Sequence, residues 1–282
     1  MGRWVKIVMM PCGEFLGRKW NLQDLVIATV LSSMHFLCLF APFYFTWGAF
    51  WLAFALHMLT GLGVTLSFHR NLAHKSFRLP KWLEYLFAYI AVLSLQGSPI
   101  EWVSSHRYHH QYTDTQKDVH SPIQGFWYSH IGWIIDSSSR FGKYGGLKNV
   151  QDLKKQAFYR FLHHTYVIHA VVLPGSLLYA FGGLPFLVWV LGVRIVIVLH
   201  GTLLVNSAGH MWLAMVTLGE GWHNNHHAFD YSARQGLEWW QIDLTWYVIK
   251  ILQAIGWATD VKTPTESQKQ RKVFNGEMVA TD

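Results

Sequence analysis

Long apolar stretches constrain this chain most, because a helix needs about 20 mostly apolar residues to cross a lipid bilayer. Pro42 interrupts the first two stretches, and Gly182-Gly183 with Pro185 interrupts the last two. The stretches lie near residues 25–41, 47–68, 166–181 and 186–208. The pattern predicts an all-α integral membrane protein with four transmembrane helices in two hairpins, residues 25–68 and 166–208.

Basic residues predict how these hairpins are oriented, because Lys and Arg concentrate on the cytoplasmic side of membrane proteins. They number 4 in residues 1–24, 12 in residues 69–165 and 6 in residues 209–282, with none in either hairpin turn. Two hairpins cross the membrane an even number of times, so we expect all three regions on the cytoplasmic side. Residues 69–165 and 209–282 should then form a helical cap on the membrane part, within one domain covering 1–282. Residues 82–97 are also apolar, but Glu84 and the short length favour a helix lying in the interface.

The composition agrees with a membrane location. Charged residues make up 14%, below the roughly 25% of soluble domains, and the 15 Trp are typical of a membrane–water boundary. The net charge of +7 favours anionic lipid over nucleic acid, since no basic run or nucleic-acid motif occurs. The first twenty residues lack Ser and Thr, which makes a poor plastid transit peptide. We expect the protein to lie in the membrane of the endoplasmic reticulum, with a chloroplast membrane as the alternative location.

Histidine is the unusual residue here, with 17 in a chain so poor in charge. In His106-Arg-Tyr-His109-His110, positions i, i+3 and i+4 share one helical face, so the three imidazoles can converge on one point. The sequence His223-Asn-Asn-His226-His227 repeats this spacing. Nine histidines lie at or beyond the ends of the predicted spans: His69, His74, His106, His109, His110, His210, His223, His226 and His227.

Two further pairs have informative spacing. Asn206 and His210 stand four apart, on one helical face. His69 and His74 stand five apart, which an ideal α-helix would place about 140° apart. They can converge only if the helix ends or unwinds between them, which Asn71 would ease.

Nine imidazoles are too many ligands for one ion and about right for two. Imidazole suits iron, zinc, copper and nickel, but a catalytic zinc typically takes three protein ligands. Without an obvious catalytic Ser, Cys or base, a pair of irons that activates dioxygen fits better than a hydrolase. Candidates for carboxylates that orient the ligands are Asp114, Asp118 and Glu220. A second group of histidines is interpreted as ordinary surface or core residues: His57, His120, His130, His163, His164, His169 and His200.

The substrate site is less clear from the sequence, and its residues stay open at this point. Glu101, Trp102, Trp239 and Trp240 could line a groove, although interface anchoring is the simpler interpretation. Transport is disfavoured, because the clusters lie outside the spans and only Arg194 and a few His lie within them.

At the level of motifs, the chain resembles the membrane fatty-acyl desaturase family, which includes stearoyl-CoA desaturases and the plant Δ9 acyl-lipid and acyl-CoA desaturases. His69-Arg-Asn-Leu-Ala-His74 and the two His-x-x-His-His motifs carry the resemblance, which covers about Arg18 to Lys262. The flanks Gly-Val-Thr-Leu-Ser-Phe and Gly-Glu-Gly-Trp match as well. Asp-Thr-Gln-Lys-Asp-Val-His-Ser-Pro and Tyr-Ser-Ala-Arg-Gln-Gly-Leu-Glu-Trp-Trp-Gln-Ile-Asp resemble the plant branch.

The resemblance implies that the nine histidines bind two iron ions (Fe2+) and that Asn206 reaches one through a water. It implies a reaction that takes O2, two electrons and a saturated acyl chain, as acyl-CoA or acyl-lipid, and inserts a cis double bond, at Δ9 or Δ7. Cytochrome b5, or ferredoxin in a plastid, would be the separate electron donor. A narrow apolar tunnel would hold the acyl chain. We expect the length of the acyl chain to be read near Ala53 or His57, three to four turns from His69.

One departure from the family concerns the segment between His210 and His223, which is considerably shorter than normal. A continuous helix would separate these two histidines by about 20 Å at 1.5 Å per residue, so the chain must reverse there. We therefore expect reduced metal binding or activity. The alternatives are a catalytically impaired regulator and a fatty-acyl hydroxylase on the same scaffold.

Overall fold

The computed structural model describes residues 12–113, 115–143, 146–208 and 217–274. These residues form helices and no β-strand, apart from one isolated antiparallel bridge between Arg78 and Thr259. The α-helices are α1 Cys12–Gly17, α2 Leu22–Cys38, α3 Trp47–Leu62, α4 Lys81–Val92, α5 Pro99–Tyr112, α6 Trp133–Ile135, α7 Gln151–Lys154, α8 Ala157–His164, α9 Leu173–Phe186, α10 Arg194–Ala208, α12 His223–Ala228, α13 Leu244–Ala254 and α14 Glu266–Phe274. The π- and 3-10 segments are η1 Gly63–Ala73, η2 Pro122–Gln124, η3 Tyr128–Gly132, η4 Ser138–Lys143, η5 Lys148–Val150, η6 Ile168–Val172 and η7 Leu187–Val193.

Two helical stretches are long and apolar enough to cross a membrane, and a third is shorter. The first joins α3 and η1 into Trp47–Ala73, and the second runs over Ile168–Leu204. Gly183 breaks the second stretch, because its backbone lies at φ 64° and ψ −154°. The predicted interruption at Gly182-Gly183 therefore coincides with a real change of direction. The helix α2 has 17 residues, about 26 Å at 1.5 Å per residue, slightly less than a hydrocarbon core of about 30 Å.

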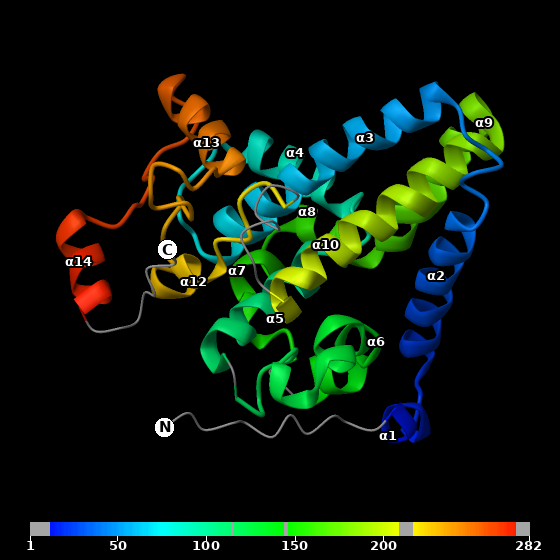
Figure 1. Cartoon of the computed structure of the whole chain (residues 1–282), viewed down its shortest axis with the longest axis horizontal. Coiled ribbons are helices and arrows are strands. Elements are labelled where there is room, and N and C mark those ends of the chain that lie inside the picture. The colour runs from blue at the N-terminus through cyan, green and yellow to red at the C-terminus, as the bar shows by residue number, and fades with distance from the viewer. Residues whose placement is uncertain (1–11, 114, 144–145, 209–216, 275–282) are drawn as a thin grey trace.

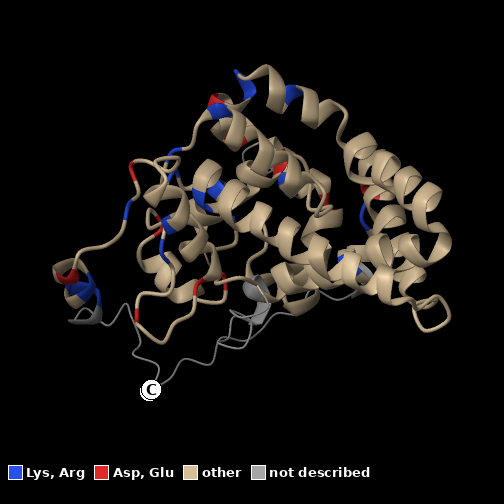
Figure 2. Cartoon of the chain, turned by 90° about the horizontal axis from the view of Figure 1, so that it is seen from above, with Lys and Arg blue, Asp and Glu red and all other residues tan. Residues whose placement is uncertain are grey.

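The long helices lead from one end of the molecule toward its centre. In Figure 1, α3 and α10 run from the right side toward the centre and contact each other, while α5 contacts η1, which continues α3, and α2 flanks the right end. Residues 39–46, between α2 and α3, and residues 173–187, which include α9, contain no Lys, Arg, Asp or Glu, and the ribbon at the right edge of Figure 2 is uncharged. The charged residues and the histidine motifs lie away from this apolar end.

The segment η1 packs so closely on α4 that only glycine fits at its start. A Cβ atom on Gly63 would lie 2.8 Å from the backbone nitrogen of Ala91. Phe68 on η1 is fully buried against α4 and α5, and α13 covers another side of η1 through Ile249. The helix that carries the first histidine motif is therefore held on several sides.

Arg194 satisfies its charge inside the helical bundle. Its guanidinium donates to the carbonyls of Val190 (2.9 Å) and Leu93 (3.0 Å) and to Oγ1 of Thr60 (3.1 Å). A buried charge is costly unless its donors are paired, and these contacts pair them. Arg194 therefore links α10 to α3 and α4.

Candidate metal centre

Five histidines form a first cluster, in which ligand nitrogens all lie within 4.8 Å of one another. The Nε2 atoms of His74 and His106 are 2.8 Å apart, and the Nε2 atom of His226 lies 3.0 Å from that of His69 and 2.9 Å from that of His110. These side chains come from η1 and its C-terminal end, from α5 and from α12. Segments more than 150 residues apart thus meet at one point.

Three histidines form a second cluster. The Nε2 atom of His227 lies 2.8 Å from that of His223 and 3.3 Å from that of His109. The two clusters therefore contain eight of the nine predicted ligands. His210 lies outside the described residues, and so does the side chain of Asn206.

The structure divides each His-x-x-His-His motif between the two clusters, so its three imidazoles do not all meet at one point. On α5, His106 and His110 reach the first cluster while His109 reaches the second. On α12 the division is reversed, since His226 joins the first cluster while His223 and His227 join the second. Positions i and i+4 point the same way, but i+3 deviates enough to reach the neighbouring cluster.

His69 and His74 converge through a π-helix. The η1 segment has i→i+5 hydrogen bonding, and the His74 amide donates to the His69 carbonyl at 3.1 Å. The wider turn brings the two rings to a centroid separation of 4.9 Å. The helix therefore widens, rather than ending, between the two residues. Asn71, expected to ease an unwinding, instead donates from Nδ2 to the Phe77 carbonyl at 3.0 Å.

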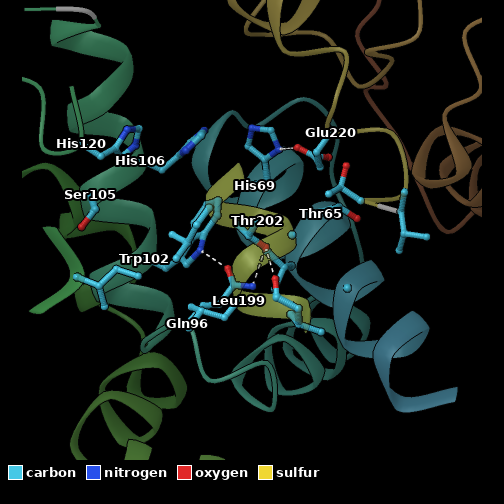
Figure 3. Close-up of a pocket in the computed structure, with 18 of the residues that line it drawn as sticks. Thr65, His69, Gln96, Trp102, Ser105, His106, His120, Leu199, Thr202 and Glu220 are labelled. Atoms are coloured by element: carbon cyan, nitrogen blue, oxygen red, sulfur yellow. Dashed lines mark hydrogen bonds and ion pairs between the residues drawn. The ribbon is translucent and has the colours of Figure 1, made fainter. Parts of the chain in front are cut away.

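Two carboxylates, a buried one on Asp118 and a partly buried one on Glu220, orient one histidine in each cluster. Glu220 contacts Nδ1 of His69, as Figure 3 shows, and Asp118 contacts Nδ1 of His109 at 2.9 Å. A proton held on Nδ1 leaves the lone pair on Nε2, which faces the cluster. Both carboxylates were predicted for this role, while Asp114 lies outside the described residues.

An arginine that the sequence analysis overlooked holds Glu220 in place. Arg70 is 1% exposed, and it pairs with Glu220 at 3.0 Å and with Asp243 at 3.0 Å. It also donates to the Ala233 carbonyl at 2.8 Å. Its position within the first motif, beside His69, was the available signal. Arg70 therefore connects that motif to the chain leading into the third motif.

The electrostatics favour the neutral form of six of the clustered histidines. Burial lowers the pKa of His74, His106, His110, His223 and His226, and the neighbouring imidazoles lower it further. Burial, with His109 nearby, lowers the pKa of His227 to about 4. Burial opposes ionisation of Glu220, but its contacts with His69 and Arg70 outweigh burial and lower its pKa. Neutral imidazoles with inward lone pairs are a donor set that fits metal cations.

His120, interpreted from the sequence as an ordinary core or surface residue, lies beside the second cluster. Its ring is 4.1 Å from that of His109, and it forms a third group of possible ligands with His109 and Asp118. Burial lowers the pKa of His120 to about 3. The Asp-Val-His spacing from Asp118 was the signal in the sequence.

A cavity adjoins the first cluster. Trp102 donates to Oε1 of Gln96 at 3.2 Å, and Nε2 of Gln96 donates to Thr202 at 2.9 Å, so three segments are fixed along its wall (Figure 3). His69 and His106 line the cavity near the cluster, and His57 lines it on α3. Of the aromatic candidates, Trp102 lines the cavity, whereas Trp239 is 89% exposed. Ala53 is buried but is not part of the lining.

Comparisons with known proteins agree with this geometry. The family model described as "Fatty acid desaturase" matches residues 45–258. The chain is 56% identical over 277 residues to a palmitoyl-monogalactosyldiacylglycerol delta-7 desaturase, chloroplastic, of Arabidopsis thaliana, covering 92% of this chain and 74% of the relative. It is 53% identical over 274 residues to an acyl-CoA C20 Delta5-desaturase of Anemone leveillei (91% and 88%). It is 50% identical over 273 residues to the delta-9 acyl-lipid desaturase 2 of Arabidopsis thaliana (91% and 89%). Its family is thereby shown: the chain is a member of the fatty acid desaturases, a family of oxidoreductases.

Proposed function

We propose that this protein is a fatty-acyl desaturase that holds two iron ions and inserts a cis double bond into a saturated acyl chain. The observation that carries the proposal is the meeting of eight histidines in two adjacent clusters beside a cavity. When bound, the iron pair would supply the oxidising chemistry, with O2 and two electrons from a separate donor. The first five histidines would hold one ion, and His109, His223 and His227 would hold the other, with His210 as a further ligand.

The protein side chains supply positioning. Glu220 and Asp118 fix the ring orientation of His69 and His109, and that leaves their Nε2 atoms directed at the clusters. The hydrogen-bonded trio of Trp102, Gln96 and Thr202 gives the cavity a rigid wall, which would hold one carbon pair of the chain near the metals.

The proposed topology places α2, α3 with η1, and the two arms of the Ile168–Leu204 stretch in a membrane. The basic and histidine-bearing regions would form the cytoplasmic cap, so the metals would lie just above the lipid. The endoplasmic reticulum with cytochrome b5 remains our proposed setting, with a chloroplast membrane and ferredoxin as the alternative. Δ7 and Δ9 are the proposed double-bond positions, because relatives carry those names.

Expression in a desaturase-deficient yeast tests this function. We expect new unsaturated fatty acids, and two irons per chain in the purified protein. His110→Gln should abolish product and lower bound iron, whereas His169→Gln, outside both clusters, should change neither. A product that gains one oxygen would indicate a hydroxylase instead. A protein with full iron and no product would support the regulator alternative.

A further inference from the structure

Three histidines outside the two clusters form a hydrogen-bonded row, which we call the imidazole trio. His35 lies on α2, His200 on α10 and His130 on η3. Nε2 of His35 lies 2.9 Å from Nε2 of His200, and Nδ1 of His200 lies 2.8 Å from Nε2 of His130. The trio therefore joins three segments that lie far apart in the sequence.

Backbone carbonyls close both ends of the trio. At one end, Nδ1 of His35 lies 2.7 Å from the Leu31 carbonyl. At the other end, the ring of His130 bonds to the Leu203 backbone. A carbonyl can only accept, so each of these bonds requires a proton on the imidazole nitrogen. Nε2 of His130 is already directed at His200, so the proton toward Leu203 lies on Nδ1.

The position of each proton shows that three neutral rings cannot complete the trio. A neutral imidazole carries one proton, on one of its two nitrogens. Because the proton of His130 lies on Nδ1, its Nε2 accepts, and His200 donates to it from Nδ1. Nε2 of His200 then has a lone pair, and so does Nε2 of His35. Two lone pairs thus face each other across 2.9 Å, and one proton is missing from the row.

Only two donor nitrogens meet at this gap, because Nδ1 of His200 is turned toward His130. Zinc sites take three or four protein ligands, so a proton fits the gap better than a metal ion. A separation of 2.9 Å also lies within the ordinary range of hydrogen bonds. Burial lowers the pKa of His130, so the added charge belongs to the pair of His35 and His200.

The other ionisable groups near the trio are engaged elsewhere or are uncharged. Asp24 on α2 forms an ion pair outside the trio, and Arg194 on α10 bonds to α3 and α4. Tyr128 on η3 bonds to an aspartate, His57 on α3 lines the cavity beside the first cluster, and Cys38 on α2 is a thiol. The segments η7 and α6, which also pack on α2, contain no ionisable side chain. The added charge is therefore held by the hydrogen bonds of the row.

We propose that His35 and His200 share one added proton, and that this charged hydrogen bond holds α2 against α10 and η3 more tightly at low pH than at high pH. Hydrogen bonds with an ionised partner are roughly twice as strong as neutral ones. When the proton is lost, two unpaired acceptors face each other, and the contact becomes unfavourable. The segment η3 leads into α6, where Trp133 and Ile134 line the cavity beside the first cluster. The packing of that cavity wall thereby depends on pH.

Local hydrogen exchange tests the proposal. Iron-loaded protein in detergent is exchanged in steps from about pH 5.5 to about pH 8.5. Protection factors, which correct for the intrinsic effect of pH on exchange, are compared for α2 and α3. The shared proton stabilises the contact below the ordinary imidazole pKa of about 6.5, and this stabilisation is lost as the pH rises further. We expect protection of α2 to fall about tenfold, the factor that 1.4 kcal/mol gives, while protection of α3 stays constant.

A glutamine variant separates the charge from the hydrogen bond. In His35→Gln an amide N–H donates to Nε2 of His200 without an added proton, so protection of α2 should lose its dependence on pH. His164→Gln, at an exposed position of α8, is the matched control and should keep that dependence.

The sign of the pH dependence in the unaltered protein decides the proposal even without the variants. Protection of α2 that stays constant or rises with pH would overturn it, and so would an unchanged fall in His35→Gln. A metal ion that His35→Gln releases and His164→Gln retains would show that the gap holds a metal instead of a proton, which also overturns it.

Discussion

Replacing Arg70 by methionine should destabilise the protein strongly, because it removes the cation from a buried group of charges. Arg70 contacts two carboxylates, Glu220 and Asp243, and one backbone carbonyl, all at 2.8–3.0 Å. Methionine fills part of the volume but leaves both carboxylates without their positive partner. Glu220 would lose its contact with Arg70 and keep those with His69 and Gln235.

The expected loss of stability in Arg70→Met follows from the burial of Arg70. Breaking a buried ion pair costs about 3–5 kcal/mol, because the remaining charge stays desolvated. At about 2–4 °C of melting temperature per kcal/mol, the loss is roughly 6–20 °C. Arg78 provides a matched control on the same stretch of chain, since it pairs with Asp260 at 3.1 Å but is 81% exposed. Arg78→Met should cost no more than about 1 kcal/mol.

Thermal unfolding in detergent, followed by near-ultraviolet circular dichroism, measures both variants. A double-mutant cycle that combines Arg70→Met with Asp243→Asn separates the coupling energy of this pair from the other losses of stability. Arg70 and Asp243 should couple by about 0.5–3 kcal/mol. If Arg70→Met melts within about 2 °C of the unaltered protein, the buried charge group does not stabilise the fold, and the reasoning is refuted.

The other predictions concern the metals, pH, chain length and the short segment. Glu220→Gln should weaken metal binding about 10- to 100-fold in a titration with ferrous iron, since the orientation of its histidine is lost; unchanged affinity would remove Glu220 from this role. Burial raises the pKa of Asp152, but hydrogen bonds from Arg107 and Lys75 outweigh burial and lower the pKa below 3.8. The ionised Asp152 carboxylate therefore stabilises the fold above pH 3.8, and this stabilisation is lost as the pH falls below that value. Asp152→Asn should therefore lower the melting temperature at pH 7 and lose its effect at acid pH, and a constant difference across this range would contradict the assignment. His57→Trp should shift the fatty-acid products, measured by gas chromatography, toward shorter chains. An unaltered profile would show that His57 does not limit the acyl chain in the cavity beside the first cluster. Lengthening the segment within 211–222 should raise bound iron and product yield; equal values in both forms would dismiss the expected impairment.

The sequence predicted the all-helical class well, because that class depends on local patterns. Apolar length and the position of Gly183 are readable residue by residue, and the break at Gly183 agrees with prediction. The π-helix of η1 could not be read in this way. A pattern with i→i+5 spacing resembles an interrupted α-helix until the packing of Gly63 on Ala91 is known.

Eight of the candidate ligand histidines lie in the two clusters, but their arrangement was not predicted. Which histidine joins which cluster depends on the relative orientation of α5 and α12, which long-range packing decides. His120 and Arg70 were missed for a similar reason. Their partners, His109 in the one case and Glu220 with Asp243 in the other, become neighbours only in the folded chain.

The division of each His-x-x-His-His motif between two clusters makes α5 and α12 rigid spacers. Because one helical turn on either helix reaches both clusters, the distance between the two ions would be fixed by backbone geometry rather than by the ions themselves. Tilting either helix would disturb both ions together. Loading should therefore be cooperative, so that partly filled protein with a single iron is a minor species at every stage of metal uptake.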